Sequence, residues 1–94
     1  EFVAEDDAMF PLLDIGDVAL IYKQNTIEDG ATHLIILDNK TTIRKIITTE
    51  DKSYYELIAM NPCYKAVKIY TDQISQITIL GKVVKAENKS AFKK

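Results

Sequence analysis

The chain has 94 residues with 12 basic and 14 acidic side chains, a formal net charge of −2 and 47% hydrophobic residues. This is the composition of one ordinary globular domain, and its slightly acidic balance argues against direct contact with the phosphate backbone of nucleic acids. With one cysteine, Cys63, and one histidine, it can form neither an internal disulfide nor a zinc site, so we expect no metal and no cofactor. No apolar run approaches the ~20 residues that cross a bilayer, so we expect no membrane segment and a cytoplasmic location.

β-Branched side chains are abundant, since Val, Ile and Thr together supply 26 of the 94 residues. Their stiff side chains suit pleated strands better than helices, which predicts a mostly β fold. We expect a single domain over residues 1–94, with a core over 1–86 and a polar tail over 87–94. The chain starts without Met, which suggests a fragment whose N-terminal part is absent.

Seven short segments are apolar or alternate between apolar and polar residues, and turn residues separate them, which predicts seven strands. In chain order these segments are 2–4, 17–22, 32–37, 41–49, 54–60, 67–70 and 76–85. We expect single helical turns over residues 8–13 and 71–74. Asp38 and Asn39 predict a hairpin turn, and Gly81 predicts a bulge or bend in the last strand.

Five short motifs follow one another along the chain: EDDAMFP (5–11), DIGDV (14–18), TIRKI (42–46), NPCY (61–64) and ILGKVV (79–84). In this order they resemble the Gly-(Asn/Asp)-Ser-Met-x-Pro, Gly-Asp, Thr-Val-Lys-(Arg/Lys)-Leu, Asn-Pro-x-Tyr and Gly-Lys-Val elements of one family. That family is the C-terminal domain of LexA and the phage repressors, the S24 serine/lysine self-cleaving peptidases. The resemblance implies a LexA-like (signal-peptidase-like) fold, in which twisted antiparallel sheets form a partly open barrel with at most short helical turns.

The resemblance also implies a catalytic dyad, in which the serine before Met is the nucleophile and a buried lysine is the general base. This chain has Ala8 and Arg44 at those positions. Alanine has no oxygen to attack a carbonyl, and a guanidinium stays protonated in proteins and cannot accept the nucleophile's proton. The dyad is therefore expected to be degenerate, with no functional catalytic residue. The other cleft positions that the resemblance implies are Met9, Pro11, Asn61 and Pro62.

The dyad positions admit two other interpretations. Lys45 is a poor substitute base, because successive side chains of a strand point to opposite faces of the sheet. The second is an active S24 self-cleaving repressor peptidase carrying an engineered Ser-to-Ala change at Ala8. Arg44 argues against this alternative, because a designer disabling the lysine would usually choose a small neutral residue.

The resemblance further implies a non-cleaving oligomerisation and regulatory domain of a phage-repressor-like transcription regulator. We expect a homodimer that holds two DNA-binding heads, so that operator DNA is bound through an N-terminal domain absent from this chain. An antirepressor protein or a recombinase filament is a further expected partner. The last strand has little charge or proline to protect a free edge, so it is the expected contact between copies. Its interface candidates are Ile77, Ile79, Lys82 and Val84.

Two polar residues, His33 and Arg44, carry expectations of their own. His33 lies among apolar neighbours without a Ser or Cys motif, so we expect a hydrogen-bonded strand residue and no catalytic group. If Arg44 faces a half-buried cleft, its charge must be paired, because an unpaired buried charge is costly. The acidic segment 5–7 is the expected partner.

Overall fold

The computed structural model describes residues 1–51 and 53–87, and residues 88–94 of the expected polar tail lie outside them. Seven strands make up most of the fold, as the abundance of β-branched residues predicts. In chain order they are β1 (Phe2–Val3), β2 (Val18–Lys23), β3 (Thr32–Leu37), β4 (Lys40–Thr48), β5 (Tyr54–Ile58), β6 (Val67–Tyr70) and β7 (Ile77–Glu87). A short 3₁₀-helix, η1 (Thr71–Gln76), lies between β6 and β7. The mostly β prediction is confirmed.

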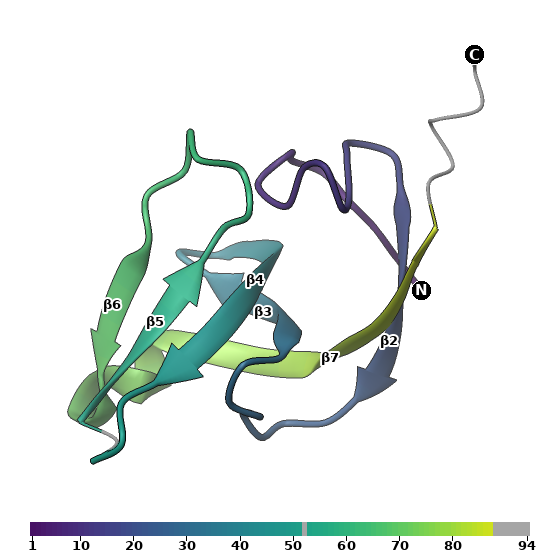
Figure 1. Cartoon of the computed structure of the whole chain (residues 1–94). Coiled ribbons are helices and arrows are strands. Elements are labelled where there is room, and N and C mark those ends of the chain that lie inside the picture. Colours follow the sequence, from purple (N-terminus) through teal and green to yellow (C-terminus); the bar gives the residue numbers. More distant parts are fainter. Residues whose placement is uncertain (52, 88–94) are drawn as a thin grey trace.

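The strands form one antiparallel sheet in the order β1-β2-β7-β3-β4-β5-β6. The sheet is open, with β1 and β6 as its two edges. Figure 1 shows how it coils: β5 and β6 lie at one end, β2 lies at the other, and β7 runs between them. The expected partly open barrel is therefore a single coiled sheet that does not close.

Strand β7 joins the two ends of the sheet. Its residues 77–79 pair with β3, whereas Val83 and residues 85–87 pair with β2. Within this strand, Gly81 and Lys82 have partners on both sides. Strand β7 is thus an interior strand and not the free edge that the sequence suggested, although each of its halves is paired on one side only.

The register of β7 slips twice, at Leu80 and at Val84, which have no partner in the ladders with β3 and β2. The first slip lies beside Gly81 and confirms the predicted bulge. A Cβ at Gly81 would lie 2.6 Å from the carbonyl oxygen of Tyr22 and would also collide with the side chain of Ile21. Glycine is needed here because another backbone approaches this closely.

The buried apolar residues form two cores. Leu34 and Ile35 are consecutive on β3 and belong to different cores. Since consecutive residues of a strand point to opposite faces, the two cores lie on opposite faces of the sheet. The buried members of the first core are Ala4, Met9, Leu13, Ala19, Leu34 and Ile43. Those of the second are Ile35, Ile46, Leu57, Ile69 and Ile77. The loop between β1 and β2 supplies Met9 and Leu13 to the first core, so apolar packing holds that loop in place.

The two expected helical turns have different outcomes. The turn after β6 is confirmed and extends over the whole of η1. Residues 8–13 instead form successive turns, in which the Phe10 amide donates to the carbonyl of Asp7 and the Leu13 amide donates to that of Met9. Pro11 has no amide hydrogen, so it cannot continue a helical series of hydrogen bonds. No helix in the described part of the chain is long and apolar enough to cross a membrane.

Candidate functional site

Ala8 lies in the loop between β1 and β2 and is 0% exposed. Its amide donates a hydrogen bond of 3.1 Å to Oδ1 of Asp6, and its carbonyl accepts one of 2.8 Å from the amide of Asn61. Both polar groups of its backbone are therefore satisfied inside the protein. The side chain at this position is a methyl group with no access to solvent.

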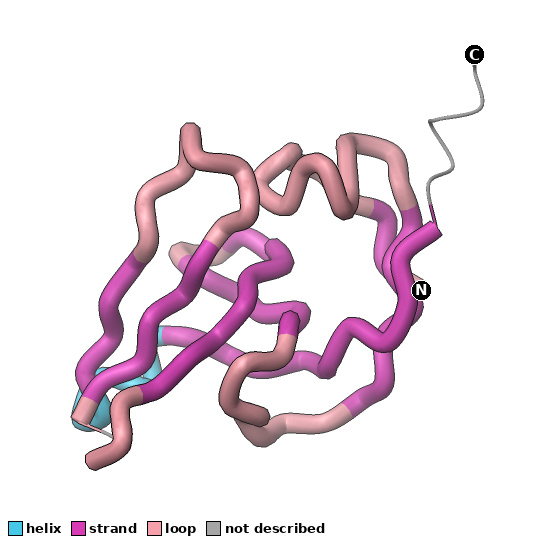
Figure 2. The backbone as a smooth tube through the Cα atoms, viewed as in Figure 1, coloured by secondary structure: helices cyan, strands magenta, loops and turns pink. Residues whose placement is uncertain are grey.

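The loop between β5 and β6 holds the Ala8 loop from the other side, and Figure 2 shows the two loops next to each other. Nδ2 of Asn61 donates to the carbonyl of Asp7 at 3.0 Å, and the hydroxyl of Tyr64 donates to Oδ1 of Asp7 at 2.8 Å. The Asn61 side chain also accepts from the amide of Cys63 at 2.9 Å. The hydrogen bond to Asp7 raises the pKa of Tyr64. The Asn-Pro-x-Tyr motif thus acts as a clamp on the loop that carries Ala8.

Arg44 lies on β4 and is 8% exposed. Its Nη1 donates to Oγ1 of Thr42 and to the carbonyl of Ile43. The guanidinium carbon lies 5.4 Å from the centroid of the Tyr64 ring, within the range of a cation–π contact. Burial lowers the pKa of Arg44, and the charges of Asp6 and Tyr64 act in the opposite direction.

The expected partner of Arg44, the acidic segment 5–7, contacts it only indirectly. Oγ1 of Thr42 accepts from Arg44 and donates to Oδ2 of Asp6 at 3.1 Å, so the hydroxyl lies between the two charges. Oδ1 of Asp6 accepts from the amide of Ala8. Arg44 and the backbone of Ala8 are therefore linked through Thr42 and Asp6, and among the described residues no direct ion pair joins Arg44 to Asp6.

A cavity of about 200 Å³ lies beside Arg44. It is lined by Asp6, Leu37, Asp38, Lys40, Thr42, Arg44 and Tyr64. None of the cleft positions expected from sequence lines it. Met9 is buried in the first core, Asn61 is half-buried in the loop clamp, and Pro11 and Pro62 are exposed.

Sequence reasoning did not single out Thr42 or Tyr64 as site residues. Thr42 is two residues before Arg44 on one strand, so the period of two predicts that both side chains face the same side. Tyr64 was visible as the last residue of a motif, but its contact with Arg44 depends on how two distant loops meet. The position of Thr42 beside Arg44 was therefore readable from the sequence, whereas the contact between Tyr64 and Arg44 was not.

The sequence of the chain is similar to the sequences of known proteins. A sequence model of the family described as Peptidase S24-like matches residues 2–84. The chain belongs to the Peptidase S24-like family. The LexA repressor of Oleidesulfovibrio alaskensis is 30% identical to this S24-like domain over 69 residues, which are 73% of the chain. The matched part is 31% of that repressor, so the chain spans about a third of the length of the relative it matches.

The interface candidates of the S24-like domain occupy different environments along β7. Ile77 is buried in the second core, and Ile79 packs against that core while half-buried. Nζ of Lys82 lies 3.0 Å from a carboxylate oxygen of Glu28 in an ion pair. Val84 is the most open of the four, with 58% of its surface exposed.

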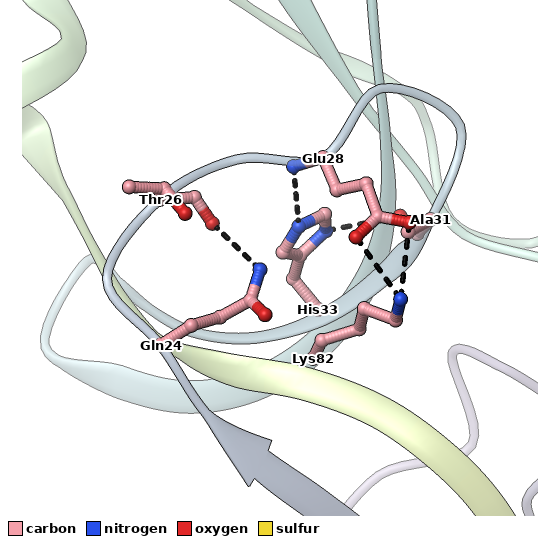
Figure 3. A network of polar contacts seen from close by, with 6 residues as sticks. All are labelled: Gln24, Thr26, Glu28, Ala31, His33 and Lys82. Carbon is pink, nitrogen blue, oxygen red and sulfur yellow. Dashed lines mark hydrogen bonds and ion pairs between the residues drawn. The ribbon is translucent and has the colours of Figure 1, made fainter.

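His33 is a structural residue of the S24-like domain, as expected. Its ring is 0% exposed, Nε2 accepts a 3.0 Å hydrogen bond from the amide of Glu28, and Nδ1 lies 3.0 Å from the carbonyl oxygen of Ala31 (Figure 3). Since Nε2 accepts, the ring is neutral and Nδ1 carries the hydrogen that is donated to Ala31. Burial lowers the pKa of His33. Figure 3 also shows the ion pair between Lys82 and Glu28 beside the ring.

Proposed function

We propose that this S24-like domain does not cleave peptide bonds and serves as the self-associating regulatory domain of a phage-repressor-like transcription regulator. The observation that carries the proposal is the side chain at the nucleophile position. The side chain of Ala8 has no oxygen, and its methyl group is fully buried and outside the lining of the Arg44 cavity. A covalent route needs an accessible nucleophile, which this position does not supply.

The base position supports the same proposal independently. A lysine can act as a general base when burial brings its pKa near neutrality, whereas a guanidinium remains protonated. Burial lowers the pKa of Arg44 but cannot turn it into a proton acceptor at physiological pH. Lys45, the adjacent cation, is exposed, as alternation along β4 predicts for the opposite face.

The regulatory part of the proposal draws on the relationship to the LexA repressor. In this proposal the domain holds two DNA-binding heads together, and operator DNA is bound by a further N-terminal domain. When one head occupies its half-site, the second binds intramolecularly, which raises affinity about 10²- to 10⁴-fold without new contacts. Because the domain does not cleave itself, release from DNA takes another route, with an antirepressor protein or a recombinase filament as the partner.

Self-association is proposed to involve the last part of β7. Val83, Lys85 and Ala86 pair with β2 on one side, and no strand among the described residues pairs with them on the other side. Val84 lies in this part, is exposed and has no partner in the ladder. A two-fold contact here would cover that side chain and satisfy the unpaired backbone.

Cleavage is tested in the full-length protein that contains this domain, using Ala8→Ser, Arg44→Lys and the double variant. We expect no self-cleavage by Ala8→Ser between pH 7 and 10, with or without activated recombinase filament, because its hydroxyl has no base to activate it. The double variant has both the serine hydroxyl and the lysine amine that the dyad needs. Comparing it with each single variant shows which of the two positions prevents cleavage. Cleavage by Ala8→Ser alone, seen as two fragments on a gel, would support the alternative of an active peptidase with an engineered alanine.

Self-association is tested by analytical ultracentrifugation of the chain over a concentration series. We expect a dimer with a micromolar dissociation constant, and we expect Val84→Lys to weaken it at least tenfold. Ile15→Lys is the matched control, because Ile15 and Val84 are both 58% exposed and Ile15 lies in a turn outside the ladder between β2 and β7. A chain that stays monomeric up to about 1 mM would contradict this part of the proposal.

A further inference from the structure

Arg44 has hydrogen-bond donors that the protein leaves open. A guanidinium carries five N–H groups on three nitrogens. Its described hydrogen bonds, to Thr42 and Ile43, both come from Nη1. Among the described residues, every fully buried side-chain nitrogen or oxygen has a hydrogen-bond partner. The remaining nitrogens, Nη2 and Nε, are therefore reached by solvent, although the residue as a whole is more than nine-tenths buried.

The charge of Arg44 is also only partly balanced. The two oxygens of the nearby carboxylate, Asp6, accept hydrogen bonds from the amide of Ala8 and from the hydroxyl of Thr42. Burial is the dominant influence on the pKa of Arg44 and lowers it, and the charge of Asp6 opposes this lowering. A buried cation in this situation is stabilised by an anion that replaces the lost water.

The cavity defines what kind of anion fits. A volume of about 200 Å³ equals roughly six or seven water molecules at ~30 Å³ each. Leu37 and the Tyr64 ring provide apolar surface, and the negative charges of Asp6 and Asp38 offset the positive charges of Lys40 and Arg44, so the lining has no excess positive charge for a dianion. The flat fork of a guanidinium matches the two oxygens of a carboxylate. The lining thus favours a small singly charged carboxylate with a short carbon skeleton over a phosphate dianion.

We propose that the cavity beside Arg44 is a binding site for a small carboxylate of about the size of an amino acid, held by Nη2 and Nε of Arg44. In this site the carboxylate occupies the open side of the guanidinium, and its carbon chain lies against Leu37 and the ring of Tyr64. The site concerns binding alone, so it holds whether or not the domain self-associates.

The test is an NMR titration of the ¹⁵N-labelled chain with sodium propionate. We expect saturable shifts of the Arg44 Nε–H signal and of the amide signals of Thr42 and Tyr64, with a dissociation constant of about 1 to 10 mM. Propionamide has the same shape without the charge, and we expect no saturable shift with it. Absence of saturation with propionate up to about 100 mM would overturn the proposal, as would inorganic phosphate binding more tightly than propionate.

Matched variants assign the binding to the guanidinium. We expect Arg44→Gln to weaken propionate binding at least tenfold, and Lys45→Gln, on the adjacent exposed residue, to leave it unchanged. Arg44→Lys keeps the charge and loses the fork, so it should also weaken binding, and it remains informative if Arg44→Gln does not fold. Equal weakening by Lys45→Gln would show a general charge effect and would overturn the assignment to Arg44.

Discussion

His33 and Arg44 face each other across β3 and β4, and both side chains are buried. His33 finds its partners nearby in sequence, at Glu28 and Ala31, and both ring nitrogens are satisfied. Arg44 bonds through one nitrogen, to Thr42 and Ile43, and the residue also lines a cavity. The histidine completes a local structure, whereas the arginine has donors that the described residues do not use.

The difference follows from the chemistry of the two side chains. Burial is the main cause that lowers the pKa of both groups. An imidazole responds by staying neutral near physiological pH, and it then needs only one donor and one acceptor. A guanidinium cannot lose its proton, so its charge persists in the protein interior. Burial therefore leaves His33 neutral and fully hydrogen-bonded, whereas it leaves Arg44 charged and with N–H donors that the described residues do not use.

The largest expected effect comes from removing each side chain in turn. His33→Leu leaves the Glu28 amide and the Ala31 carbonyl without partners, so we expect a loss of about 2–4 kcal/mol in the free energy of unfolding. Arg44→Met removes a buried charge and should change that free energy by less than about 1 kcal/mol. Urea denaturation followed by circular dichroism measures both. An Arg44→Met variant that is destabilised as much as His33→Leu would show that the two residues have the same structural role.

Thr42 probes the link between Arg44 and Asp6. We expect Thr42→Val to cost about 1–2 kcal/mol, because it keeps the shape but removes the hydroxyl that bonds to both groups. Thr41→Val, on the adjacent residue and the opposite face, is the matched control and should cost less. If the two valine variants unfold at the same urea concentration, the hydroxyl of Thr42 does not hold the two charges together.

The pH dependence of stability tests the neutral state of His33. Burial lowers its pKa in the folded protein below the ordinary value of 6.5, so below about pH 6.5 the unfolded chain binds more protons than the folded one. The contribution of His33 to stability is therefore complete above pH 6.5 and is lost as the pH falls toward its folded pKa. Unfolding free energies at pH 7.5, 6.5 and 5.5 should show this loss for the unmodified chain and a weaker one for His33→Gln. Parallel pH profiles for the two proteins would contradict a neutral buried ring.

The smallest effect is expected at the ion pair beside His33. The side chains of Lys82 and Glu28 are 32% and 55% exposed, so solvent screens their attraction. We expect Lys82→Gln to cost no more than about 0.5 kcal/mol. Lys85→Gln, an exposed position on the same strand, is the control. A cost above about 1 kcal/mol for Lys82→Gln alone would mean that the pair also fixes the loop that carries the partners of His33.

Much of the strand pattern was readable from local sequence, because alternation and turn residues act within a few positions of the chain. The turn at Asp38 and Asn39 is present, and both residues have positive φ as a tight hairpin requires. The expectation that β7 lies at an edge of the sheet was wrong, because the change of partner from β3 to β2 at Gly81 and Lys82 depends on the coiling of the whole sheet. Local pattern predicts that a strand exists, and it does not predict which side of the strand is paired.

The sequence by itself predicted that Ala8 occupies the nucleophile position and Arg44 the base position, because the motifs that carry this prediction are local. It also determined a mostly β domain and its membership of the S24-like family. Only the tertiary structure decided that Ala8 is buried, that Thr42 lies between Arg44 and Asp6, and that the ring of Tyr64 makes a cation–π contact with the guanidinium. These contacts join segments far apart in the chain, so they depend on strand register and loop packing, which no local pattern encodes.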